Sequence, residues 1–131
     1  MARTVLGSIR MGRRVLVADD DQDLLDLVTA CLVRSGLEVV QATTGADLLE
    51  QVAEHGPFDL VITDVAMPWM TGFQAAACVR EAGLDIPVLV MTGRTDPSLP
   101  DRVRALGTRA RLLRKPFNSA QLTDAVRDLI G

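Results

Sequence analysis

Two short apolar runs in this chain each end in aspartate. The first run leads into Asp19, Asp20 and Asp21, and a later one leads into Asp64. Carboxylates that gather at one place repel one another and lose hydration, so a cation or a shared proton normally compensates them. A divalent metal that prefers oxygen ligands is the first candidate for that cation. Asp64 is then left to accept chemistry.

A hydroxyl and an ammonium group complete the set of candidate residues. Lys115 is the only lysine among 14 basic residues. Arginine grips flat anions with a fork of donors, whereas lysine offers a compact point charge. A lysine in so arginine-rich a chain indicates a site that needs a point charge, although an ordinary surface lysine is the alternative. Thr92 ends another apolar run, which is a weak indication when taken alone.

The elements that must position these residues alternate along the chain. Short runs rich in β-branched residues predict five strands, at residues 15–18, 37–42, 60–63, 88–91 and 110–113. Helical spacing and capping residues predict five helices, at residues 23–34, 44–54, 73–82, 97–107 and 119–130. The first helix has an apolar pattern formed by Leu24, Leu27, Val28, Cys31 and Leu32. The last is capped by Asn118 or Ser119.

Strict strand–helix alternation predicts an α/β protein of the flavodoxin-like, doubly wound type. Its five parallel strands would follow the order 2-1-3-4-5, with five helices around them. Strands one and three are neighbours in that order. Their terminal acids would therefore meet at one edge of the sheet, where open α/β sheets bind ligands.

Size and composition indicate one folded domain. The chain has 131 residues, 48% of them hydrophobic, a net charge of −3 and a mean hydropathy of +0.22. We expect a flexible tail over residues 1–13 and the folded domain over residues 14–131. No apolar run resembles a signal peptide or a membrane helix, so we expect a cytoplasmic location without membrane contact.

The net charge, the arginines, the two cysteines and the single histidine give no strong indication of a further function. The net charge gives no reason to expect direct nucleic-acid binding. Arginines concentrate between residues 94 and 115, which indicates a solvated face or, alternatively, a partner or dimer surface. We expect a monomer or a weak dimer. Cys31 and Cys78 are predicted to be buried free thiols, and His55 a surface residue near a helix end.

Four motifs, each at the end of a different strand, together resemble the response regulator receiver domain of two-component signalling. They are residues 15–20, Asp64 followed by Met67-Pro68 and Gly72, Thr92, and Lys115-Pro116-Phe117. The resemblance covers about residues 14–130. It implies that Asp64 is the phosphoacceptor, that Thr92 is the switch hydroxyl and that Lys115 pairs with the phosphorylated aspartate. Pro116 matches a peptide bond that is cis in the family.

The same resemblance implies a metal ion and protein partners. Mg²⁺, which Mn²⁺ could replace, would be held by Asp19, Asp20, Asp64 and the backbone carbonyl of Ala66. A histidine kinase or a phosphotransfer protein would donate the phosphoryl group. The surface around the fourth helix, the fifth strand and the fifth helix would then change, and a downstream protein would read it. We expect no output domain and no enzymatic role beyond assisting its own phosphorylation and dephosphorylation.

Some residues depart from the family pattern or carry further expectations. Leu112 stands where an aromatic residue usually couples the site to the output face, so that coupling is questionable here. Arg94 is hypothesised to shield the phosphoryl group from water. Trp69 is expected to report on metal or phosphate binding. Residues 91–97 and 114–117 also resemble the terminal receivers of hybrid histidine kinases, so the chain could be a fragment of such a kinase.

Three other functions compete with this interpretation. A magnesium-dependent aspartyl phosphohydrolase would use Asp19 and Asp21, but the Gly-Thr pair expected after them is missing. A flavin or nucleotide binder would need a phosphate-binding loop after the first strand, and three aspartates would repel phosphate there. A receiver-like adaptor that is never phosphorylated is the third alternative, against which the complete residue set argues.

Overall fold

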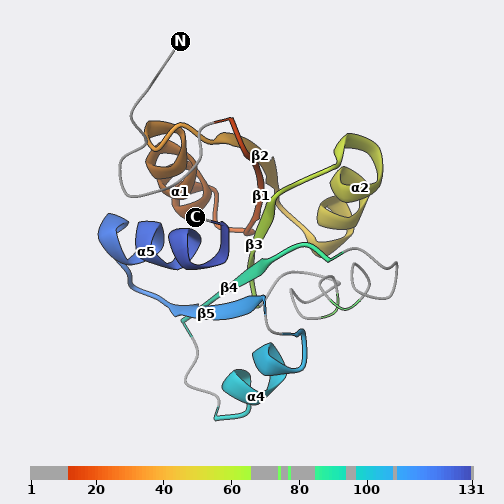
Figure 1. Ribbon diagram of the computed structural model, residues 1–131, viewed down its shortest axis with the longest axis vertical. Helices are drawn as coiled ribbons and strands as arrows, with labels where there is room; N and C mark the ends of the chain where they lie inside the picture. Colours follow the sequence, from red (N-terminus) through yellow and green to blue (C-terminus); the bar gives the residue numbers. More distant parts are fainter. Residues whose placement is uncertain are drawn as a thin grey trace.

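The computed structural model describes residues 12–65, 74, 77, 85–93, 97–107 and 109–130 (Figure 1). The strands are β1 (Arg14–Ala18), β2 (Glu38–Ala42), β3 (Leu60–Asp64), β4 (Val88–Thr92) and β5 (Ala110–Arg114). The helices are α1 (Gln22–Arg34), α2 (Gly45–His55), α4 (Leu99–Arg104) and α5 (Ser119–Ile130).

The five strands form one parallel sheet in the order β2-β1-β3-β4-β5, which confirms the predicted topology. Side chains alternate across this sheet, as the pleat requires. Val15 and Val17 face the core under α1 and α5, whereas Leu16 and Ala18 face the core under α2. A third cluster lies between β4, β5 and α4. Helices therefore cover both faces of the sheet (Figure 1).

The predicted strands agree with the structure to within one residue at each end. β2 begins at Glu38 instead of residue 37. β3 and β4 each extend one residue further, so Asp64 and Thr92 are the last residues of their strands. Because the ends of parallel strands lie at one edge, this extension places both side chains where ligands bind.

Two of the predicted helices differ from the structure or lie largely outside the described residues. α4 covers only Leu99–Arg104, whereas a helix over 97–107 was predicted, because the chain turns after Arg104 and reaches Gly107 at a φ of +112°. The helix predicted over 73–82 lies outside the described residues except for Gln74 and Ala77, both of which are helical.

Capping residues begin three of the described helices, and those of α2 and α5 agree with the sequence prediction. The Asp21 side chain accepts hydrogen bonds from two backbone N–H groups of α1. Thr44 Oγ1 accepts a hydrogen bond from the Asp47 N–H at the start of α2. Asn118 and Gln121 exchange hydrogen bonds at the start of α5, which is the reciprocal arrangement of a capping box.

The amino ends of the strands are held together by Arg14. Its N–H donates to Asp59 Oδ2 at 2.8 Å, and its guanidinium donates to the carbonyl oxygens of His55 and Pro57. The same guanidinium lies 3.6 Å from Glu38 and 4.8 Å from the centre of the Phe58 ring. One arginine therefore links β1 to β2 and to the segment between α2 and β3.

The remaining structural predictions have mixed outcomes. Cys31 is buried and free, and His55 is exposed as the last residue of α2, as predicted. Cys78 and nearly all of the predicted tail over 1–13 lie outside the described residues. Within the described ranges, no helix has the length and hydropathy that crossing a membrane requires.

Candidate functional site

Three aspartates meet at the carboxyl edge of the sheet. Asp19 directly follows β1, and Asp64 ends β3, which pairs with β1. One carboxylate oxygen each from Asp19, Asp20 and Asp64 lies within 4.8 Å of the others. Asp19 and Asp64 are buried, whereas Asp20 is exposed. The structure thus brings together three of the four predicted metal ligands, and Ala66 lies outside the described residues.

Lys115 reaches into this cluster from the end of β5. Its Nζ lies 3.1 Å from Asp19 Oδ2 and 3.1 Å from Asp64 Oδ1. Strand β4 separates β5 from β3, so the side chain extends past the end of β4. The Lys115 N–H donates to the Thr92 carbonyl at 2.7 Å, which continues the pairing of these two strands. The Lys115–Pro116 peptide bond is cis, as the resemblance implied.

Charge in the cluster is unbalanced. Burial raises the pKa of Asp64 above its usual value, and the nearby charges of Asp19 and Asp20 add to this, outweighing the effect of Lys115. Burial alone would lower the pKa of Lys115, but its hydrogen bonds to Asp19 and Asp64 outweigh burial and raise that pKa. Among the described residues, three carboxylates therefore share one ammonium group.

This donor set fits a small divalent cation. Mg²⁺ takes oxygen ligands and is usually held by one or two carboxylates together with water and phosphate oxygens. Asp19, Asp20 and Asp64 offer such oxygens at one place, and a cation would compensate both the burial of Asp64 and the repulsion from its neighbours, which together raise its pKa.

Thr92, for which a switch role was predicted, lies at the carboxyl edge of the sheet, but several associated residues are not described. Thr92 is buried and ends β4 beside β3. Leu112 is half-buried and packs against the cluster under α4. Arg94 and Trp69, for which shielding and reporting roles were expected, lie outside the described residues.

Asp21 is close in sequence but separate in role. Its carboxylate caps α1 and is not a member of the acidic cluster. The phosphohydrolase alternative needs Asp21 as a second catalytic acid beside Asp19, so the capping contact argues against that alternative.

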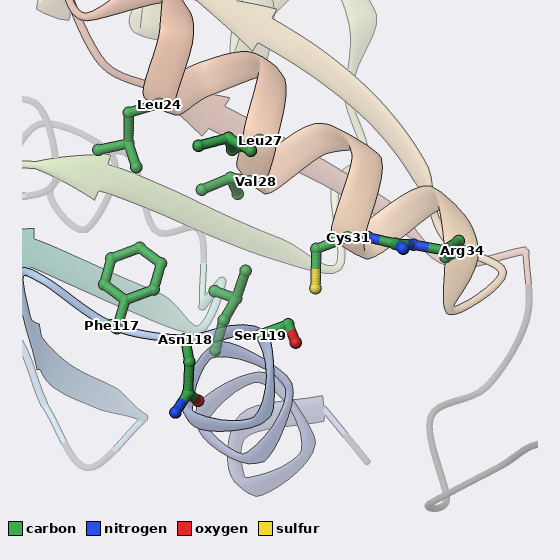
Figure 2. Close-up of a pocket in the computed structure, with 9 residues that line it drawn as sticks. Leu24, Leu27, Val28, Cys31, Arg34, Phe117, Asn118 and Ser119 are labelled. Carbon is green, nitrogen blue, oxygen red and sulfur yellow. The ribbon is translucent and has the colours of Figure 1, made fainter.

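An apolar groove borders the site and was not predicted. Leu24, Leu27 and Phe117 line it next to Lys115 and Asp21. A cavity of about 170 Å³ continues it between α1 and α5, where Cys31 and Leu122 also line it (Figure 2). Leu27 belongs to the predicted apolar pattern of α1, yet 69% of it is exposed.

Comparison with known proteins gives a consistent family. The family model described as "Response regulator receiver domain" matches residues 15–127. The chemotaxis response regulator CheY4 of Vibrio cholerae has a similar structure, with a TM-score of 0.83, 31% identity, and coverage of 91% of this chain and 99% of that one. The signal receiver domain of the putative response regulator NarL from Mycobacterium tuberculosis gives a TM-score of 0.82 at 32% identity, covering 91% and 96%.

The chain belongs to the response regulator receiver domain family. It is also 38% identical over 118 residues to the transcriptional regulatory protein PrrA of M. tuberculosis, covering 89% of this chain and 49% of PrrA. The uncharacterized transcriptional regulatory protein YbdJ of Bacillus subtilis is 33% identical over 119 residues, with 91% and 51% covered. This chain thus spans about half the length of the curated relatives it matches.

Proposed function

We propose that this receiver domain is a phosphoacceptor switch in which Asp64 takes a phosphoryl group from a histidine kinase or a phosphotransfer protein. The observation that carries this proposal is the Lys115 ammonium group, 3.1 Å from Asp64 and 3.1 Å from Asp19. A buried acceptor beside a fixed point charge suits a reaction that places new negative charge on Asp64. We propose an acceptor of this kind and not an enzyme with a separate substrate.

The chemistry follows from the positions of the side chains. The Asp64 carboxylate attacks phosphorus in line, so that a P–O bond forms while the P–N bond to the donor histidine breaks. Lys115 neutralises charge on the transferred group. Mg²⁺, or Mn²⁺ in its place, supplies further charge neutralisation when bound. Asp19, Asp20 and Asp64 would hold the ion, with the Ala66 carbonyl as the proposed fourth ligand.

Transmission of the signal begins at Thr92 and Lys115. The Thr92 hydroxyl can donate to a phosphoryl oxygen, and the backbones of the two residues are already hydrogen-bonded. Phosphorylation of Asp64 would therefore shift β4 and β5 together, and the helices α4 and α5 that pack against them. Leu112 packs toward α4 and offers an aliphatic contact there. We propose that a protein partner in the cytoplasm reads this surface.

The test is covalent phosphorylation by a small donor. Incubation with acetyl phosphate and Mg²⁺ should add one phosphoryl group, detected by intact-protein mass and lost on treatment with hydroxylamine. Asp64→Asn should show no gain, and chelation of the metal should block the gain in the wild type. Asp85→Asn, at an exposed aspartate away from the cluster, is the matched control and should react like the wild type.

Two outcomes would count against this function. A folded protein that binds Mg²⁺ but gains no mass from acetyl phosphate or from a phosphorylated kinase would be an adaptor. Steady hydrolysis of a phosphomonoester such as p-nitrophenyl phosphate, lost in Asp19→Asn, would favour the phosphohydrolase.

A further inference from the structure

Both oxygens of the Asp19 carboxylate are held by other groups of the chain. Oδ1 accepts the backbone N–H of Asp21 at 2.9 Å, and Oδ2 accepts Lys115 Nζ at 3.1 Å. Only 1% of the Asp19 side chain is exposed, so water contributes little to its orientation. The direction in which Asp19 points therefore depends on where the Asp21 N–H lies.

The Asp21 backbone is in turn fixed by its own side chain. Asp21 Oδ1 lies 3.1 Å from the Asp23 nitrogen and 3.3 Å from the Leu24 nitrogen. These bonds keep Asp21 at φ −87° and ψ +102°, the extended conformation of a residue that precedes a helix. Removing the acceptor oxygen would free the first turn of α1 and, with it, the N–H that orients Asp19.

We propose that Asp21 is a positioning residue, which sets the affinity of the acidic cluster for Mg²⁺ by holding Asp19 in place through the cap of α1. This inference rests on the proposed function, because it assumes that the cluster binds Mg²⁺. Asp21 does so without ligating the ion, since its carboxylate is used by the helix.

A role through charge is the competing explanation. As a neighbouring anion, Asp21 would attract a cation whatever its hydrogen bonds. The two roles separate by substitution, because a helix cap needs an acceptor oxygen and not a charge. Asn and Ser keep the acceptor and remove the charge, whereas Ala removes both.

Mg²⁺ titration followed by calorimetry, with no phosphoryl donor present, tests the proposal. Asp21→Ala should weaken the affinity about fivefold, which corresponds to about 1 kcal/mol. Asp21→Asn and Asp21→Ser should stay within about twofold of the wild type. Asp21→Gly, which helix starts tolerate but which lacks the acceptor oxygen, should also weaken binding and serves if Asp21→Ala does not fold.

Thr44→Ala is the matched control, because it removes the equivalent cap of α2. It should lower the melting temperature about as much as Asp21→Ala while leaving Mg²⁺ affinity unchanged. If Asp21→Ala also lowers only the melting temperature, the residue is merely structural and the proposal is wrong. If Asp21→Asn binds as weakly as Asp21→Ala, charge is the cause and the proposal is equally wrong. A wild-type protein that does not bind Mg²⁺ would instead refute the metal site of the proposed function.

Discussion

Charge is balanced at the amino end of the central strands and unbalanced at their carboxyl end. At the amino end, the Arg14 guanidinium is matched by the carboxylate of Glu38, by two backbone carbonyls and by the face of Phe58, while the Arg14 backbone N–H donates to Asp59. At the carboxyl end, three aspartates share one lysine, and burial together with neighbouring negative charge raises the pKa of Asp64.

This difference separates stability from binding. A cation surrounded by acceptors holds the strands together. Its charge and hydrogen-bond donors are already used within the chain, so a ligand would find little to bind there. A cluster with excess negative charge costs folding free energy, and a bound cation recovers that free energy. Substitutions at the amino end should therefore change stability alone, whereas those at the carboxyl end should change stability and metal binding together.

Lys115→Met should have the largest effect. It leaves two buried carboxylates without a cation, and breaking a buried ion pair in this way costs about 3 kcal/mol. Urea denaturation at pH 7 without Mg²⁺ should show this loss. Because the pKa of Lys115 is raised above 10.5, its contribution is complete below that pH and is lost as the pH rises through the raised pKa.

The dependence on acid provides the control for Lys115→Met. Near pH 3, Asp64 is mostly protonated because its pKa is raised above 3.8, so the difference from the wild type should shrink. A deficit of equal size at pH 3 and pH 7 would mean that lost packing of the lysine stem, and not unpaired charge, explains the effect.

Arg14→Met should be next in size, with a loss of about 1.5 kcal/mol, because several hydrogen bonds and the Phe58 contact disappear together. Mg²⁺ affinity, measured by calorimetry, should remain within twofold of the wild type. Glu38→Gln, which removes only the 3.6 Å ion pair, should cost less than about 0.5 kcal/mol. A large change in Mg²⁺ affinity in Arg14→Met would show that the two ends of the strands are not independent.

Asp64→Asn should have the opposite sign and stabilise the protein by an amount on the order of 1 kcal/mol at pH 7. In the folded state the pKa of Asp64 lies above 3.8. The folded protein therefore binds this proton more tightly than the unfolded chain does. Wild-type stability therefore falls as the pH rises from about 3.8 through the raised pKa, and the variant escapes this fall.

Thermal melts of Asp64→Asn and the wild type between pH 3 and pH 7 measure the difference. The gain should disappear at the acid end of the series. It should also disappear with saturating Mg²⁺, which stabilises only the form that binds it. A variant less stable than the wild type at pH 7 would mean that the Lys115 contact outweighs burial.

Arg104→Ala should have the smallest effect. Its partner Asp101 lies one helical turn away, and the two side chains are 72% and 76% exposed. Pairs of this kind contribute less than about 0.5 kcal/mol and are screened by salt. A loss above 1 kcal/mol in urea denaturation would show that α4 depends on this pair.

The sequence predicted the sheet and the acidic cluster for the same physical reason. Strands buried on both faces are short apolar runs, which can be recognised in the sequence. The carboxyl ends of parallel strands lie at one edge of the sheet, which brings Asp19 and Asp64 together. The single lysine could be recognised because it departs from the arginine usage of the rest of the chain.

The contacts of Arg14, the exposure of Leu27 and the end of α4 could not be predicted, because they depend on tertiary contacts that leave no pattern in the sequence. Arg14, Glu38 and Asp59 are ordinary residues in ordinary positions, and their meeting depends on strand register and on the path of the chain after α2. Leu27 fits an apolar helical pattern but lies beyond the surface that α5 covers. α4 ends at Arg104 with Ala105 as its C-cap, and the chain reaches a positive φ only at Gly107.

The proposed acceptor site is assembled from strands far apart in the chain. Asp19, Asp64, Thr92 and Lys115 stand at or just beyond the ends of β1, β3, β4 and β5. A chain still under synthesis carries the acceptor aspartate long before Lys115 exists to reach it. The complete set of side chains is therefore assembled only after β5, the last strand in the chain, has joined the sheet.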